Sequence, residues 1–236
     1  MLAWILPVAM AATPRPDRPL VTRTGALAEP YTLEMELGAT FADGPTRAVP
    51  AALKYSIGGV VEPRIMTNLG AYEAGTPGLE LGIKVRMFAS DDGTNALAMW
   101  VSSRVPMRNE AWRGQWHALF TTQLAKPLWM RVNGGLDFVE DGEGSLTFGG
   151  TPLTWALVLE PTSGFDLFAE LAGRAGGPDC EGTACAYGDL AFSVGAAVAV
   201  TPILVVDAAV GYSARTNDAI GTVGLTSNFG GGGRDR

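Results

Sequence analysis

The chain has little of what metal or nucleic-acid chemistry requires. His117 is the one histidine and only two cysteines occur among 236 residues, so no zinc site is expected. We also find no metal-ligand spacing and no phosphate-binding glycine loop, and therefore expect no cofactor. Charged residues make up only 17% of the chain, and the formal charge of -7 offers no basic excess that could neutralise phosphates. The composition thus argues against a nucleic-acid partner.

What the chain does have is apolar residues, at 47%, arranged with a period of two. From Tyr31 to Phe41 the odd positions are apolar and the even positions are polar or small, which is typical of a strand with one apolar face. Most repeats of this pattern run about 9–12 residues, a length that suits a tilted membrane-spanning strand. About twelve strands are predicted, near 31–41, 52–60, 64–72, 79–88, 97–104, 115–124, 128–138, 152–160, 165–174, 188–199, 202–213 and 218–229.

The connections and the aromatic residues favour a membrane barrel over other all-β folds. Longer connections are expected near 42–51, 105–114, 139–151 and 175–187, and they alternate with shorter ones at 61–63, 125–127, 161–163 and 200–201. Long loops on one rim and short turns on the other are typical of outer-membrane barrels. Aromatic residues of the apolar face lie near strand ends, as an interfacial girdle requires: Tyr31, Phe41, Trp116, Phe138, Phe165, Phe192, Tyr212 and Phe229. We therefore predict an all-β fold, a transmembrane antiparallel β-barrel of about twelve strands.

Two other folds compete with this prediction. Residues 191–212 are nearly all apolar and could form a transmembrane helix, but Thr201-Pro202 interrupts them and Asp207 would lie in lipid. A soluble secreted all-β protein is the second alternative. The interior of such a protein would be apolar, whereas here the alternate residues that would face inward include charged ones.

Both ends of the chain extend beyond the predicted barrel, which we place at 31–229. Residues 1–12 are an apolar run in which Ala9-Met10-Ala11 fits the cleavage pattern of a signal peptide, although no Lys or Arg precedes the run. Segment 13–30 is rich in proline, and we interpret it as an extended linker or a periplasmic tail. Residues 230–236 form a Gly-rich tail.

Cys180 and Cys185 lie in a polar, turn-rich stretch within one of the longer connections. We expect them to form a local disulfide that closes an exposed loop, which implies an oxidising compartment. The alternative is a pair of free thiols.

The last forty residues carry a resemblance to a known family. A strand from Tyr187, a turn at Thr201-Pro202, a strand with inward Asp207 before Gly211-Tyr212, and a final strand ending in Phe229 follow one another. This arrangement resembles the outer-membrane transporters related to the phenol-degradation meta-pathway protein. The resemblance implies a bacterial outer-membrane barrel that transports a small solute and is inserted by the barrel-assembly machinery. This chain departs from the family in one respect. Such proteins normally end in a phenylalanine, whereas here a Gly-rich tail follows Phe229.

The strand positions that alternate with the apolar ones are expected to face the lumen, and many of them are charged. The lumen-lining residues that we single out are Lys84, Arg86, Arg104, Arg131, Asp137, Asp166, Glu170 and Asp207. Further inward charges are expected at Glu34, Glu36, Lys54, Glu62, Arg64, Glu80, Glu160, Arg174 and Asp189. We expect Lys84 and Arg86 to face Glu170 and Asp207 across the barrel. Trp100, Trp129 and Phe168 also point inward and either fill the lumen or line a path.

Three functions remain compatible with this lining. The favoured function is passive passage of a small solute through a barrel embedded in outer-membrane lipid. The alternative is a plugged structural barrel whose charges pair and whose outer loops bind a ligand or partner. The weakest is a lipid-modifying enzyme that uses His117 with Ser102 and Asn133, for which no nucleophile motif is present. We therefore expect no catalytic residue.

Overall fold

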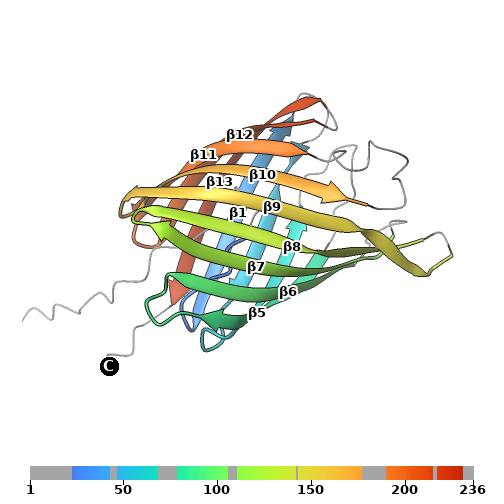
Figure 1. Cartoon of the computed structure of the whole chain (residues 1–236), viewed down its shortest axis with the longest axis horizontal. Coiled ribbons are helices and arrows are strands. Elements are labelled where there is room, and N and C mark those ends of the chain that lie inside the picture. Colours follow the sequence, from blue (N-terminus) through green and yellow to red (C-terminus); the bar gives the residue numbers. More distant parts are fainter. Residues whose placement is uncertain are drawn as a thin grey trace, which may run out of the picture.

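The strands form a closed barrel. The structure is a computed structural model, and it describes residues 23–42, 47–68, 79–105, 111–141, 143–176, 190–214 and 217–230. Its strands follow one another around the barrel in chain order (Figure 1). They are β1 (Thr32–Ala42), β2 (Arg47–Ala48), β3 (Pro50–Tyr55), β4 (Val61–Asn68), β5 (Leu79–Ala89), β6 (Asn95–Val105), β7 (Arg113–Ala125), β8 (Leu128–Glu140), β9 (Leu146–Thr162), β10 (Phe165–Ala175), β11 (Ala191–Thr201), β12 (Leu204–Ser213) and β13 (Asp218–Gly230).

Closure comes from the pairing of the last strand with the first. β13 and β1 run antiparallel from Thr32 opposite Gly230 to Ala42 opposite Ile220. β2 and β3 both pair with β1, β2 near its end and β3 near its start, so the two short strands lie end to end and together form one strand of the wall. The barrel is therefore twelve-stranded, as predicted, and closure removes the exposed sheet edges that lipid would not tolerate.

The two rims of the barrel differ in the length of their connections. One rim, here called the short-turn rim, carries the turns at 56–60, 90–94, 126–127, 163–164 and 202–203. The opposite rim, here called the long-loop rim, includes the longer connections at 69–78, 106–112 and 176–190. The chain enters β1 and leaves β13 at the short-turn rim.

The predicted turn at 61–63 is wrong, because these residues are the first three of β4. The turn lies at 56–60 instead, where Gly58 and Gly59 take positive φ values of 58° and 67°, a conformation open to glycine. Pro63 misled the prediction. It is tolerated in β4 because pairing with β3 begins only at Arg64, so its missing N–H interrupts no ladder on that side.

The predicted loop at 139–151 is also wrong. β8 and β9 continue as a paired hairpin beyond the barrel wall (Figure 1), and its tip is held by Asp141, whose Oδ1 accepts the N–H groups of Glu143 and Ser145 at 2.9 Å. The register shifts after Asp137, where Gly150 takes a φ of 131°. This irregularity interrupts the alternation that sequence reading relies on, although the ladder resumes past it.

The outer face of the barrel is apolar. Side chains exposed on it include Tyr31, Phe41, Trp116, Phe192, Tyr212 and Phe229, which are six of the predicted girdle aromatics. A continuous apolar exterior around a charged interior is the inverse of a soluble barrel and the pattern of a membrane-spanning one. Residues 191–212 form the β11–β12 hairpin and not a helix. Among the described residues, no helix is long and apolar enough to cross a bilayer.

Five predictions concern residues outside the described part of the chain. They are the signal peptide at 1–12, the part of the Pro-rich segment at 13–22, the Cys180–Cys185 disulfide, the inward charge at Asp189, and the Gly-rich tail beyond Gly230. Each stays a prediction.

Candidate functional site: the barrel lumen

The residues singled out for the lumen differ in exposure. Lys84, Arg131, Asp137, Glu170 and Asp207 are buried, while Arg104 and Asp166 are half-buried. Arg86 is exposed and lies next to the 56–60 turn at the short-turn rim, where its backbone N–H donates to the carbonyl of Val60. The other members of the set come from β5, β6, β8, β10 and β12, so their burial places charge around much of the inner wall.

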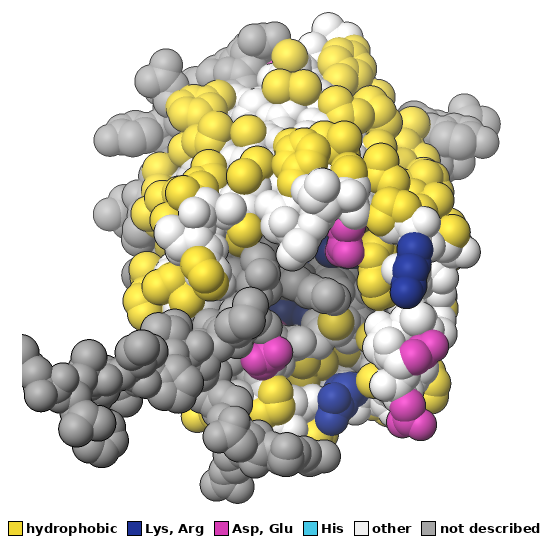
Figure 2. Space-filling view, turned by 90° about the vertical axis from the view of Figure 1, so that its left-hand side faces the viewer, with side chains coloured by type: hydrophobic (Ala, Val, Ile, Leu, Met, Phe, Trp, Pro, Cys, Tyr) yellow, Lys and Arg dark blue, Asp and Glu magenta, His cyan; other side chains and the backbone are white. Residues whose placement is uncertain are grey.

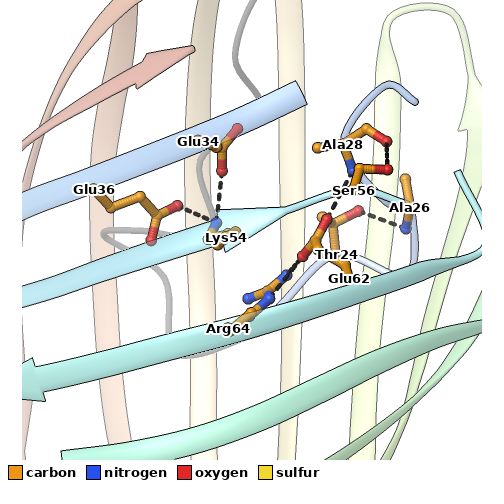
Figure 3. Close-up of polar contacts among 9 residues, drawn as sticks. All are labelled: Thr24, Ala26, Ala28, Glu34, Glu36, Lys54, Ser56, Glu62 and Arg64. Atoms are coloured by element: carbon orange, nitrogen blue, oxygen red, sulfur yellow. Dashed lines mark hydrogen bonds and ion pairs between the residues drawn. The ribbon is translucent and has the colours of Figure 1, made fainter. Parts of the chain in front are cut away.

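The wall formed by β1 and β3 carries a buried three-residue charge cluster. Lys54 of β3 donates from Nζ to Glu34 Oε1 at 2.7 Å and also to Glu36 Oε1, both on β1 (Figure 3). The three side chains are 2–4% exposed. Ions this buried are tolerated only because they are paired, since desolvation of a lone charge costs several kcal/mol.

A second pair lies next to the first on β4. Arg64 donates from Nε to Glu62 Oε1 at 2.7 Å, and both side chains are buried (Figure 3). These contacts join residues of one strand or of adjacent strands. Sequence parity placed the charges on the inner face, but it did not reveal this local pairing, because registers between strands are not visible in a single strand's alternation.

A third cluster lies nearer the long-loop rim. Asp137 of β8 accepts from His117 Nε2 of β7 at 3.1 Å, and Arg174 of β10 donates to its other carboxylate oxygen. His117 approaches this position over Gly135, where a Cβ atom would lie 2.3 Å from the imidazole Cδ2. The side chain of Arg174 is 37% exposed, so this cluster is more open than the other two.

The catalytic arrangement considered for His117 is not formed among the described residues. Ser102 Oγ contacts Gln115 Oε1 at 3.4 Å, and His117 bonds to Asp137. A hydrolase would need a serine hydroxyl within hydrogen-bond reach of the imidazole. The geometry gives no support to catalysis by this histidine.

Two of the inward aromatic residues, Trp100 and Phe168, lie close over glycines of the wall. A Cβ atom at Gly82 would be 2.0 Å from Trp100, and one at Gly195 would be 2.4 Å from Phe168. Trp100 packs with Ala98 and Leu119, and Phe168 packs with Ala156, Val158 and Ala209, with Trp129 beside them. The lumen therefore contains two apolar clusters between its charged groups, and strand glycines make room for them.

Residues 23–29, here called the inner strap, lie inside the barrel. The chain reverses direction at Tyr31, which has a φ of 63°, and the strap runs back across the inner wall from β3 and β4 toward β7. Ser56 Oγ donates to the carbonyl of Ala28, and the Ala28 N–H donates to Glu62 Oε2, each at 2.9 Å (Figure 3). For these residues the expected linker or periplasmic tail is corrected to an element packed in the lumen.

The barrel viewed from the short-turn rim shows apolar side chains around much of the outside, with charged side chains in the opening and along the right-hand edge of the rim (Figure 2). Glu62, Arg64 and Lys54 lie near this end of β4 and β3, so the inner wall here carries charges of both signs, although each side chain is itself buried. Such a lining favours polar solutes over apolar ones.

Comparison with known proteins places the fold among outer-membrane barrels. No family model matches the chain, and no curated protein does. Among solved structures, the KdgM porin in complex with disordered oligogalacturonate superposes with a TM-score of 0.65 at 12% identity, covering 84% of this chain and 99% of that one. The NanC porin gives 0.61 at 8% identity, covering 82% and 98%. The translocator domain of autotransporter NalP from Neisseria meningitidis gives 0.52 at 16% identity, covering 84% and 87%.

Proposed function

We propose that this chain is a channel of the bacterial outer membrane through which a small polar solute passes passively. The observation that carries the proposal is the combination of an apolar exterior with a lumen that holds buried charges of both signs. The porin-like fold supports it. A closed barrel that only filled a membrane would not need ionised groups on its inner face, each of which costs desolvation energy.

The path for the solute runs along the half of the barrel formed by β8 to β13. Polar side chains on the inner face of this half include Arg131, Asn133, Thr154, Thr226 and Asn228. This half holds acidic groups at Asp137, Asp166, Glu170 and Asp207 against basic groups at Arg131 and Arg174, and Arg174 pairs with Asp137. This acidic balance favours cations over anions, because charged rings at a constriction set ion selectivity.

The decisive experiment is single-channel conductance of the protein refolded into a planar bilayer, with a heat-modifiability gel to show that it has folded. Discrete conductance steps with a reversal potential favouring cations are expected. Asp207→Asn should lower the cation preference, since Asp207 is buried in the lumen, and Asp91→Asn in the exposed 90–94 turn is the matched control. Folded protein that never conducts would refute the channel.

A plugged structural barrel is the second candidate, favoured by the burial of the lumen residues and by the inner strap. In that case the charge clusters serve stability alone, and the long-loop rim binds a ligand or partner outside the cell. The two candidates differ in the Asp207→Asn variant. A plugged barrel should lose heat resistance with no conductance to change, whereas a channel should keep its fold and change its selectivity.

Further expectations accompany the proposed function. The resemblance of the β11–β13 region to transporters related to the phenol-degradation meta-pathway protein supports passive passage of a small solute. The final strand ending near Phe229 supports insertion by the barrel-assembly machinery, and the apolar exterior supports direct contact with membrane lipid. A local disulfide between Cys180 and Cys185 would close one loop of the long-loop rim.

A further inference from the structure

The inner strap is docked on the barrel wall at both of its ends. At one end, Ser56 and Glu62 bond to the backbone of Ala28. At the other end, the Gly25 N–H donates to Thr121 Oγ1 at 2.8 Å, and Thr24 Oγ1 lies 3.3 Å from the same hydroxyl. A segment that merely trailed from the barrel would have its amides solvated by water, whereas these are satisfied by wall side chains.

The strap fits this position because of its small residues. Gly25 lies so close to the wall that a Cβ atom would be 2.6 Å from the carbonyl oxygen of Leu119 and 2.7 Å from that of Ala96. These are backbone atoms, which cannot move aside as a side-chain tip could. Any larger residue at position 25 is therefore incompatible with the docked strap.

Apolar and cation–π contacts also hold the strap. Leu27 packs against the cluster of Trp100, Ala98 and Leu119, and the Arg23 guanidinium carbon lies 4.3 Å from the centroid of the Trp100 ring. The Arg64 guanidinium carbon lies 5.3 Å from the same ring. Trp100 thus joins the strap to the wall, and it can lie this close to the wall because position 82 is a glycine.

We propose that the inner strap is the constriction of the channel, which narrows the lumen along β4 to β7 and sets the size limit for solutes. This inference rests on the proposed function. A chain segment crossing the inner wall occupies cross-section that would otherwise be open to water. The polar and charged side chains on the inner face of β8 to β13 lie on the other part of the wall and are themselves buried.

The test displaces the strap without altering the barrel wall. Gly25→Val forces the strap away from Leu119 and Ala96, while Gly221→Val on β13 is the matched control, because nothing lies within 4 Å of a Cβ there. Displacement is followed with Leu27→Cys, in a background with Cys180→Ser and Cys185→Ser, by the rate of labelling with a water-soluble maleimide. We expect slow labelling in the parent and in Gly221→Val, and fast labelling in Gly25→Val.

The conductance of the same proteins decides the inference. We expect Gly25→Val to raise single-channel conductance by about twofold or more, because the open cross-section grows, and to admit larger polyethylene glycols. Thr121→Val, which removes the hydroxyl that holds Gly25 and Thr24, should raise it in the same direction.

Equal conductance in parent and Gly25→Val, with Leu27→Cys labelled quickly only in the latter, would overturn the constriction while leaving the channel intact. Fast labelling in the parent would overturn the docking itself. Absence of conductance from every folded variant would overturn the proposed channel function as well as the strap's role in it.

Discussion

Replacing Lys54 with Met tests whether the inner wall is held by buried ion pairs. Lys54 is the cation between Glu34 and Glu36, and the side-chain exposures of the three residues are 2%, 4% and 3%. Methionine matches the length of the lysine stem, so the change removes the charge and the hydrogen bonds while keeping most of the packing. Two adjacent carboxylates would then be buried without the ammonium that holds them.

The expected loss follows from the cost of leaving a buried charge without its partner. Removing one member of a buried ion pair lowers the free energy of unfolding by about 3–5 kcal/mol. Removing all the charges together costs far less, and it is often neutral, because no ion remains to be desolvated. The triple variant Lys54→Met, Glu34→Gln and Glu36→Gln should therefore recover most of the stability that Lys54→Met loses.

The assay is urea-induced unfolding from lipid vesicles, followed by tryptophan fluorescence and by heat-modifiability on gels. Lys126→Met, in an exposed turn at the short-turn rim, is the control and should change stability by less than about 0.5 kcal/mol. A Lys54→Met protein as stable as the control would show that these charges are solvated by lumen water. A triple variant no more stable than Lys54→Met would refute the reasoning about uncompensated charge.

Three further predictions concern separate parts of the barrel. Gly195→Val should lower the free energy of unfolding by about 1–3 kcal/mol through overpacking, because a Cβ atom there would lie 2.4 Å from Phe168; stability equal to Gly221→Val would contradict the packing argument. Hydrogen bonds from the Ser90 side chain and from Thr94 lower the pKa of Asp92 from 3.8 to about 2. The stability that ionised Asp92 contributes is therefore complete above the pKa that Asp92 has in the unfolded chain, and it is lost as pH falls through the lower pKa of the folded protein. A carboxyl titration by NMR that gave Asp92 a pKa near 3.8 would disprove this lowering. Asp137→Asn removes the acid that holds His117 and Arg174, so the reversal potential should shift away from cation preference. An unchanged potential would place this cluster outside the ion path.

Much of the fold could be predicted from the sequence because a strand's side chains alternate between its two faces. The pattern over Tyr31 to Phe41 assigned Glu34 and Glu36 to the inner face, and both are buried there. The same alternation gave twelve strands, the apolar exterior and the inward direction of Trp100 and Phe168. These features depend on each strand and its environment alone.

Sequence reading failed where local signals conflicted with pairing. Pro63 suggested a turn but lies in β4, because its position in the β3–β4 register leaves its missing N–H without consequence there. Only the outer part of the β8–β9 hairpin, at 139–151, is predicted as a loop, because Gly149 and Gly150 interrupt the alternation while the ladder continues past them. Both errors arise because pairing with the neighbouring strand, and not the residue type alone, decides whether a residue lies in a strand or in a turn.

The sequence by itself determined the two faces of the wall and hence the membrane-spanning barrel. Only the tertiary structure decided how the lumen is filled: Lys54 meets Glu34 and Glu36 through the β1–β3 register, and Gly25 docks on Thr121, which is 96 residues away in the chain. Strand periodicity is a property of neighbouring residues. The position of the inner strap depends on side chains of β4, β6, β7 and the 56–60 turn, which come together only when these strands pair side by side in the sheet.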